Sequence, residues 1–434
     1  MSIKVVPNPN YGKRTAASSP MLACLEADKV DSVLAFHRSI EGYAPTPLVR
    51  LRHLSSQLGV KSVYVKDESF RFGLNAFKAL GGSYAIANYL ANKLGMDISD
   101  LPYDRLISEE IRDRLGEVTF VTATDGNHGR GVAWTAQKLR QKCVVHMPKG
   151  AAFERLENIR ALGAEVDITD MNYDDAVRLS SREAEENGWV LVQDTSWPGY
   201  EDIPRSIIQG YTTMLAEAVE QLEKEHGGQR PTHLFVQAGV GALATATVGY
   251  FVNLYGSSDE GGPTIVVVEP ENASCIFDTL RAEDGKIHAV GGNLQTIMAG
   301  LACGEPVTVG IDLLANYVDF VVSLPDYVAA QGMRTLSSPV RARDGDPTTD
   351  AEKATDDRII SGESGAAPFG FAYEVLTNPG LAEVKEVLGI NSESVLFFLS
   401  TEGDTDRASF DAIVNNGAYA HPSAYQASTP AKEI

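Results

Sequence analysis

Short apolar runs alternate with amphipathic stretches over most of the chain from residue 119 onward. Gly, Pro or Asp bounds these runs, a pattern that predicts strands of a parallel sheet buried on both faces. We expect strands at 119–125, 143–148, 165–170, 189–194, 232–239, 264–271 and 394–398. We expect helices at 127–140, 151–162, 173–186, 204–225 and 241–255. This alternation of strands and helices predicts the α/β fold class.

The length of the chain and the position of its polar segments refine this picture. At 434 residues the chain is too long for one hydrophobic core, so we expect two domains. Ligands of open parallel sheets bind beyond the carboxyl ends of the strands. The polar, glycine-rich segments of this chain follow predicted strands, so the site is expected there.

Composition and charge exclude several functions. The chain carries 58 acidic and 37 basic residues, a formal charge of −21 that repels nucleic acid and anionic membranes. It has no apolar run of about 18 residues, so no membrane span is expected. The N-terminus lacks an apolar secretory segment, and the four cysteines show no metal-binding or redox spacing, which favours the cytoplasm.

The segment KDESFRFGLNAFKALGGSYA (66–85) places Lys78 at the start of a predicted helix. The positive end of the helix dipole disfavours a second cation, so this position is expected to lower the pKa of the amine. A lowered pKa suits a lysine that acts as a nucleophile or base. From position alone, however, a surface lysine is the more common explanation.

Three further segments join predicted strands to polar turns. They are TATDGNHGRG (122–131), QAGVGALA (237–244) and LSTEGDTD (399–406). The first two precede helices, whose initial amides can bind a carboxylate or a phosphate. Taken singly, DGNHG is also an ordinary turn, and two glycines between a strand and a helix often mark only a tight connection.

Together with Asn75, Phe77 and the Gly81-Gly82-Ser83 run, these segments resemble, in order, the motifs of the fold type II pyridoxal-phosphate enzymes. That group includes the threonine and serine dehydratases. The resemblance implies that Lys78 holds pyridoxal 5′-phosphate as an imine. The other residues that it implies for cofactor binding are Asn127, Gly239, Val240, Gly241, Ala242, Glu363 in SGESGA (361–366), and Ser400 or Thr401.

Individual roles follow from the same resemblance. Asn127 is expected to hydrogen-bond the 3′-oxygen of the cofactor, and Glu363 to lie near the ring. One hydroxyl is expected to meet the pyridine nitrogen; the register favours Ser400, and Thr401 stays open because pleat alternation points only one of them inward. The substrate is expected to bind at Thr124, Asp125, Gly126 and His128, although His128 alone is also typical of a structural histidine.

Asp125 stands where dehydratases of this group usually carry Ser. A carboxylate there has no obvious use for a hydroxyl leaving group, but it supplies a counter-charge for a β-ammonium and a base opposite Lys78. Asp194, in VQDTSWPGY (192–200), ends a predicted strand on the same edge. A strand-end Asp is equally often a turn residue. We take Lys78, Asp125 and Asp194 as the candidate catalytic residues.

Over roughly residues 45–407, the sequence resembles the diaminopropionate ammonia-lyases, whose motifs include TDMNYDD (169–175) and IMAGLACGEP (297–306). This resemblance implies elimination of ammonia from 2,3-diaminopropionate, a small amino-acid substrate, in a homodimer. A threonine or serine dehydratase is the main alternative. A non-catalytic pyridoxal-phosphate-binding protein is a remote one.

The resemblance also suggests how the chain is divided. We expect a large cofactor-binding domain of residues 1–80 plus 205–434 and a small domain of residues 81–204. The polar segment 337–357 is predicted to be a surface insertion, and 418–434 a loosely held tail. Cys275 and Cys303 flank the segment 291–301, and a disulfide between them is a hypothesis.

Overall fold

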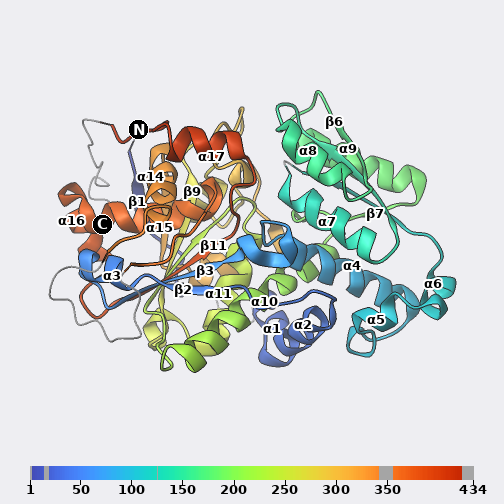
Figure 1. Ribbon diagram of the computed structural model, residues 1–434, viewed down its shortest axis with the longest axis horizontal. Coiled ribbons are helices and arrows are strands. Elements are labelled where there is room, and N and C mark those ends of the chain that lie inside the picture. Colours follow the sequence, from blue (N-terminus) through green and yellow to red (C-terminus); the bar gives the residue numbers. More distant parts are fainter. Residues whose placement is uncertain (1, 14–18, 125, 342–354, 423–434) are drawn as a thin grey trace.

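The computed structural model describes residues 2–13, 19–124, 126–341 and 355–422. Its larger sheet has the strand order β1-β10-β9-β8-β11-β3-β2 (Figure 1). The five central strands run parallel, and the edge strands β1 and β2 pair antiparallel with their neighbours. The strands are β1 (Lys4–Pro7), β2 (Leu48–Arg50), β3 (Ser62–Asp67), β8 (His233–Gln237), β9 (Thr264–Pro270), β10 (Phe320–Leu324) and β11 (Val395–Ser400).

The smaller sheet has the order β6-β5-β4-β7, and all of its pairs are parallel. In Figure 1 it stands apart from the larger sheet, with α7, α8 and α9 beside it. Its strands are β4 (Thr119–Ala123), β5 (Lys142–Met147), β6 (Glu165–Ile168) and β7 (Val190–Leu191). The predicted α/β class is therefore confirmed, whereas the predicted domain boundaries stay a prediction.

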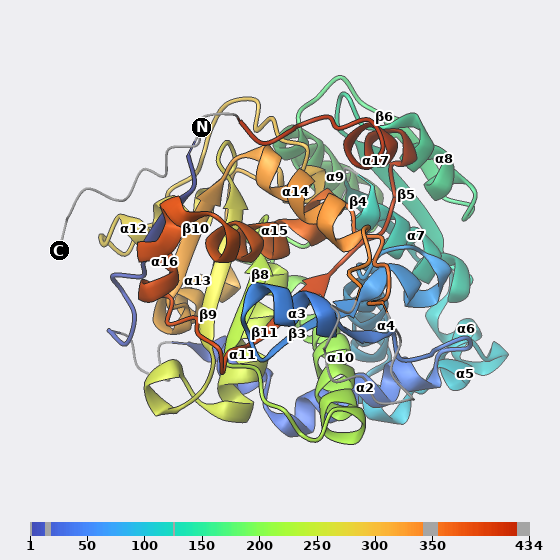
Figure 2. The same cartoon turned by 60° about the vertical axis from the view of Figure 1, so that its left-hand side comes forward.

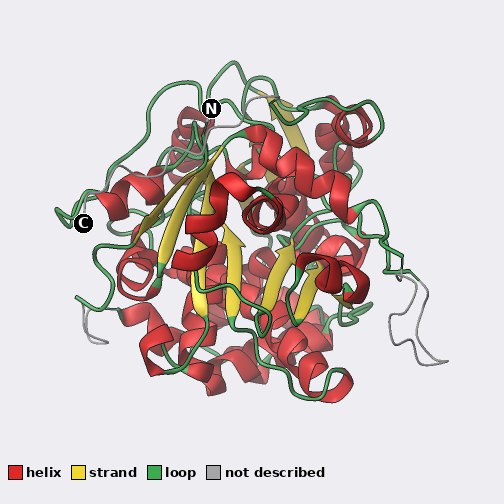
Figure 3. Cartoon of the chain, turned by 90° about the vertical axis from the view of Figure 1, so that its left-hand side faces the viewer, coloured by secondary structure: helices red, strands yellow, loops and turns green. Residues whose placement is uncertain are grey.

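Helices surround the strands of both sheets (Figures 2 and 3). The α-helices are α1 (Pro20–Cys24), α2 (Ala27–Ser39), α3 (Arg52–Leu58), α4 (Ala79–Leu94), α5 (Tyr103–Leu106), α6 (Glu109–Leu115), α7 (Asn127–Lys138), α8 (Phe153–Arg160), α9 (Tyr173–Asn187), α10 (Asp202–Glu225), α11 (Ala242–Tyr255), α12 (Cys275–Arg281), α13 (Thr308–Tyr317), α14 (Asp326–Leu336), α15 (Glu363–Thr377), α16 (Ala382–Val387) and α17 (Arg407–Val414). Short 3-10 turns are η2 (Glu68–Gly73), η3 (Ile98–Asp100), η4 (Ser258–Glu260), η5 (Ala299–Leu301) and η6 (Pro379–Leu381). Within the described ranges, no helix has the length and apolar character that crossing a membrane requires.

Helix α4 packs against α7, which lies beside the smaller sheet, and against α10. A side chain at Gly81 would place its Cβ 2.6 Å from the ring of Tyr211 on α10. A glycine is therefore required for the two helices to approach this closely. The close approach sets the position of α4, and Lys78 directly precedes its first residue.

The strand predicted at 189–194 is shorter in the structure, where β7 ends at Leu191. Beyond it, the backbone N–H of Gln193 donates to the hydroxyl of Tyr200 at 2.8 Å. The Gln193 side chain binds the backbone of Ala123 at the end of β4. Side-chain hydrogen bonds thus take the place of backbone hydrogen bonds between strands after Leu191. The alternation of apolar residues in the sequence does not show where this change occurs.

The segment predicted to be a surface insertion is only partly surface. Residues 342–354 lie outside the described part of the chain, but Asp356 is buried. Its carboxylate accepts hydrogen bonds from the backbone N–H groups of His53 and Leu54 at 3.0 and 2.9 Å. It therefore caps the first turn of α3, where backbone donors need a partner.

The predicted loose tail begins at residue 418, and residues 423–434 fall outside the described ranges. The described start is held by Arg334, whose guanidinium donates to the carbonyls of Ala418 at 3.0 Å and Tyr419 at 3.3 Å. The first residues of the tail are therefore anchored on α14.

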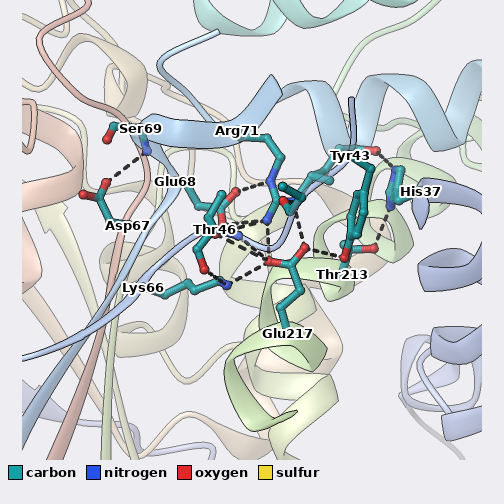
Figure 4. A network of polar contacts seen from close by, with 12 residues as sticks. His37, Tyr43, Thr46, Lys66, Asp67, Glu68, Ser69, Arg71, Thr213 and Glu217 are labelled. Atoms are coloured by element: carbon teal, nitrogen blue, oxygen red, sulfur yellow. Dashed lines mark hydrogen bonds and ion pairs between the residues drawn. The ribbon is translucent and has the colours of Figure 1, made fainter. Parts of the chain in front are cut away.

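A buried ionic cluster fixes the segment that leads to Lys78 (Figure 4). Arg71 pairs with Glu68 at 2.9 Å and with Glu217 of α10 at 2.7 Å. Lys66 pairs with Glu217 at 2.8 Å, and all four side chains are at most 1% exposed. Burial would raise the pKa of Glu217, but Arg71 and Lys66 lower it to about 2. Glu217 is therefore ionised at neutral pH, and the cluster joins β3 and η2 to α10.

We expect Glu217→Gln to lower the free energy of unfolding by about 3–5 kcal/mol, because it leaves buried cations without their counter-charge. Urea unfolding followed by circular dichroism measures the loss. The matched control is Glu220→Gln on the same helix, whose pair with Arg38 is 46% and 37% exposed. It should cost less than about 1 kcal/mol. Equal effects of the two variants would contradict this assignment.

Candidate active site

A cavity of about 700 Å³ lies where strands of both sheets end. Its walls include residues at or just after the carboxyl ends of β4, β5, β7, β8 and β11, as expected for a ligand site in parallel sheets. The predicted site residues that line it are Lys78, Thr124, Asn127, His128, Asp194, Gly239, Val240, Gly241, Ala242, Glu363 and Thr401. Gly126 and Ser400 are described but do not line the wall, and Asp125 lies outside the described residues.

Lys78 and Asp194 form an ion pair in this cavity. The Lys78 ammonium donates to Asp194 Oδ2 at 2.5 Å, with side chains 18% and 6% exposed. Burial would lower the pKa of Lys78, but the Asp194 carboxylate raises it above its usual range. The predicted lowering by the helix dipole is therefore wrong for this structure, because a nearby carboxylate outweighs it.

The same ion pair changes the pKa of Asp194. Burial would raise the pKa of its carboxyl, but Lys78 and, more weakly, His128 hold it well below the usual range. The Nδ1 atom of His128 lies 4.0 Å from Asp194 Oδ2. Asp194 is therefore ionised over the whole physiological pH range and is more than a turn residue.

The segment after β4 presents polar groups at the start of α7. The Thr124 hydroxyl accepts a hydrogen bond from the N–H of Gly126 at 2.9 Å. His128 Nε2 binds the carbonyl of Val192 at 2.8 Å, so this nitrogen carries the proton and helps to join the segments that follow β4 and β7. Asn127 Nδ2 donates to Glu402 at 2.5 Å. These bonds fix the loop against two neighbouring strand ends.

The glycine segment after β8 leads directly into α11. Gly241 has φ +98°, a left-handed conformation that favours glycine, and an added Cβ would lie 2.8 Å from Ile276. The helix that follows is 14 residues long, and its first amides and positive dipole suit a phosphate. Gly239, Val240, Gly241 and Ala242 all line the cavity.

The end of β11 offers two hydroxyls. Thr401 lines the cavity, and its hydroxyl oxygen accepts from Gln237 Nε2 at 2.7 Å. Ser400 is fully buried, and its hydroxyl has no hydrogen-bond partner among the described residues. A buried hydroxyl without a partner is costly, so the Ser400 hydroxyl still has a hydrogen bond to offer.

Two buried glutamates stand at the same end of the cavity. Burial, assisted by the nearby charge of Glu402, raises the pKa of Glu363 to about 7. The Ser409 hydroxyl donates to Glu363 at 2.5 Å. No role was predicted for Glu402, although it lies in the LSTEGDTD segment (399–406). Its bond to Asn127 crosses 275 positions, a pairing that no local pattern reveals.

All four cysteines are free thiols in the structure. The hypothetical disulfide between Cys275 and Cys303 is therefore not formed. Both residues lie near Gly239: the Cys275 thiol donates to the Gly239 carbonyl at 3.8 Å, and an added Cβ on Gly239 would lie 3.2 Å from Cys303 Sγ. Both thiols therefore pack against the start of the glycine segment.

A buried carboxyl supports this glycine segment from behind. Glu269, at the end of β9, accepts from the backbone N–H groups of Ile276 and Phe277 at 3.0 and 2.6 Å. Ile276 in turn contacts the space beside Gly241. Burial raises the pKa of Glu269 to about 8, although the two N–H groups oppose the shift. Glu269 is therefore largely protonated at neutral pH.

A family model described as pyridoxal-phosphate dependent enzyme matches residues 40–373. Together with the lysine, the glycine segment and the unpaired hydroxyl in one site, this match defines a pyridoxal-phosphate-dependent enzyme.

Similar proteins indicate to which family of pyridoxal-phosphate-dependent enzymes the chain belongs. The diaminopropionate ammonia-lyase of Salmonella typhimurium is 47% identical over 408 residues, which cover 94% of this chain and 97% of the relative. Two crystal structures of the Escherichia coli diaminopropionate ammonia-lyase are 44% identical and cover 96% of this chain and 98% of theirs. One contains D-serine and superposes with TM-score 0.84. The other contains an aminoacrylate-PLP azomethine reaction intermediate and gives 0.83.

The chain belongs to the diaminopropionate ammonia-lyase family. The predicted fold type II architecture is thereby confirmed, and so is the predicted cofactor, pyridoxal 5′-phosphate. The residues present fit this cofactor. Lys78 supplies an amine for its aldehyde, the start of α11 suits its phosphate, and the buried Ser400 hydroxyl has a donor to offer.

We expect the stability of the protein to fall between about pH 4.5 and 8 through Glu269. Its pKa is about 8 in the folded protein, against 4.5 for an exposed glutamate. A raised folded pKa gives stability that is fully present below the unfolded pKa and is lost as pH rises through the folded pKa. Thermal unfolding of Glu269→Gln, which keeps an acceptor without a titrating proton, should depend less on pH across this window. An unchanged slope would contradict the assignment.

Proposed function

We propose that this protein eliminates ammonia from 2,3-diaminopropionate, with water completing the conversion to pyruvate and two ammonia. The observation that carries the proposal is the Lys78–Asp194 pair, at 2.5 Å, in the cavity that also holds the glycine segment. The family supports it, since its solved members include one with bound D-serine and one with an aminoacrylate intermediate. The substrate is therefore a small amino acid with a leaving group on its β-carbon.

Pyridoxal phosphate, when bound, supplies an electron sink that stabilises negative charge at the substrate α-carbon. Lys78 would hold the cofactor, the amides of Gly239 to Ala242 would bind its phosphate, and Asn127 would bind its 3′-oxygen. Ser400 would donate to the pyridine nitrogen, because its buried hydroxyl has no partner among the described residues, whereas the Thr401 hydroxyl accepts from Gln237. Glu363 lies near Glu402, the acceptor of the Asn127 hydrogen bond, and would lie near the cofactor ring.

The chain's own residues move the protons. Lys78, once released from the cofactor, removes the α-proton from one face, and Asp125 removes it from the other. Asp125 also offers a counter-charge to the β-ammonium of the substrate. Asp194 holds a negative charge beside the amine of Lys78, as their hydrogen bond supports. Thr124, Gly126 and His128 shape the loop that receives the substrate carboxylate.

The purified protein should release pyruvate from 2,3-diaminopropionate with a kcat/KM at least about tenfold above that for L-serine, because L-serine lacks the second ammonium. A coupled pyruvate assay measures both rates, and Lys78→Ala serves as the inactive control. Comparable efficiencies for the two substrates would instead identify a serine or threonine dehydratase. Cofactor binding without turnover of either would identify a pyridoxal-phosphate-binding protein.

Asp125→Asn should affect the two enantiomers of 2,3-diaminopropionate unequally. Loss of a general base costs about 10²-fold or more, but only for the enantiomer whose α-proton faces Asp125. Pyruvate release from each enantiomer, measured separately at saturating cofactor, tests this. Equal losses for both enantiomers would assign Asp125 to binding of the β-ammonium rather than to proton removal.

We also propose that the protein is a cytoplasmic homodimer. The four cysteines, which show no disulfide pattern in the sequence, support the compartment. The resemblance to the family supports the dimer. The four free thiols agree with a reducing environment.

A further inference from the structure

Tyr173 contacts the Lys78–Asp194 pair from a segment that the proposed reaction leaves without a role. It is the first residue of α9 and belongs to TDMNYDD (169–175). Its side chain lines the main cavity and also a second cavity of about 410 Å³ beside it. The Tyr173 hydroxyl lies 3.4 Å from Asp194 Oδ1.

The polarity of this hydrogen bond follows from Gln193. The backbone N–H of Ala123 donates to Gln193 Oε1 at 3.0 Å, so this end of the amide is the oxygen. Gln193 Nε2 therefore donates to the carbonyl of Ala123 at 3.1 Å and to the Tyr173 hydroxyl at 2.7 Å. Because the Tyr173 oxygen accepts from Gln193, its own proton is directed to Asp194.

Each oxygen of Asp194 consequently has its own donor. Lys78 donates to Oδ2 at 2.5 Å, and Tyr173 donates to Oδ1. Asp194 is only 4% exposed, so water does little to stabilise its charged form. The titratable groups that face it among the described residues are Lys78, His128, Tyr173, Tyr200 and Tyr211.

Lys78 is the strongest of these influences, but the proposed reaction removes its ammonium. The Lys78 nitrogen is neutral when it acts as a base, and it is not an ammonium while it holds the cofactor. A buried carboxylate that loses its cation tends to take up a proton. A phenol that donates to the carboxylate favours the ionised form and keeps the side chain oriented.

We propose that Tyr173 is a positioning residue that keeps Asp194 ionised and oriented while Lys78 is engaged in catalysis. The chain from Ala123 through Gln193 to Tyr173 fixes the direction in which the phenol donates. The proposal rests on the proposed function, because it concerns the stages in which Lys78 binds the cofactor or serves as a base.

The experiment compares Tyr173→Phe with the parent holoenzyme. Removing the donor disfavours ionised Asp194, so protonation of Asp194 should occur at higher pH. The acid limb of kcat/KM for 2,3-diaminopropionate should move up by at most about one pH unit, because the 3.4 Å contact is longer than a full hydrogen bond to a charged group. The absorbance of the bound cofactor, titrated without substrate, should show the same shift. At pH values above the limb, kcat should stay close to that of the parent.

Two further variants make the result specific. Tyr64→Phe removes another buried tyrosine hydroxyl, which donates to Gln229 at 3.0 Å away from the cavity, and should move neither titration. Adding Tyr173→Phe to Asp194→Asn should change nothing beyond the effect of Asp194→Asn. An unmoved acid limb and absorbance titration in Tyr173→Phe would overturn the proposal, as would an additional loss in the double variant. If 2,3-diaminopropionate is not turned over at all, the proposed function fails, while the absorbance titration still tests Tyr173.

Discussion

The ion pair between Lys78 and Asp194 is the interaction around which this molecule is organised. Lys78 follows β3 of the larger sheet, and Asp194 follows β7 of the smaller one, so the pair joins the carboxyl ends of two separate sheets. Buried charges are tolerated only when each has a partner. The pair can form only because the two sheets face each other across the cavity.

A second group of buried ion pairs holds the segment that carries Lys78. The buried cluster of Lys66, Glu68, Arg71 and Glu217 ties the segment before Lys78 to α10 (Figure 4). The same helix packs against α4, where Gly81 permits close approach. Lys78 is thus held from both sides along the chain. A lysine on a rigid element can keep its amine directed at one carboxylate, which a lysine on a mobile loop cannot do.

Much of this arrangement could be predicted from the sequence, because the local patterns and the global fold agree. The strands predicted at 119–125, 143–148, 165–170, 232–239 and 264–271 correspond to β4, β5, β6, β8 and β9. The edge strands β1 and β2 are short and pair antiparallel, so they lack the long apolar runs of the interior. The run at β10, FVVSL, has such a pattern, but it was not among the predicted strands.

The site shows where prediction from sequence ends. Most of the predicted residues line one cavity, because motifs that follow parallel strands meet at one edge. The direction of the Lys78 pKa shift was predicted wrongly, because the helix dipole is a local feature and Asp194 is 116 positions away. Glu402 and Tyr173 were missed for the same reason. Their partners, Asn127 and Asp194, come near only after the chain has folded.

The choice of a doubly aminated substrate cannot come from the overall charge of −21, since charges on the surface are screened within about 8–10 Å in salt. Selectivity has to come from carboxylates that are buried and held. Asp194 is ionised, 4% exposed and held by two donors, so its field acts in a medium that screens little. Glu363, with a pKa of about 7, is only partly ionised near neutrality. Asp194 therefore places a fixed negative charge beside Lys78 in the cavity.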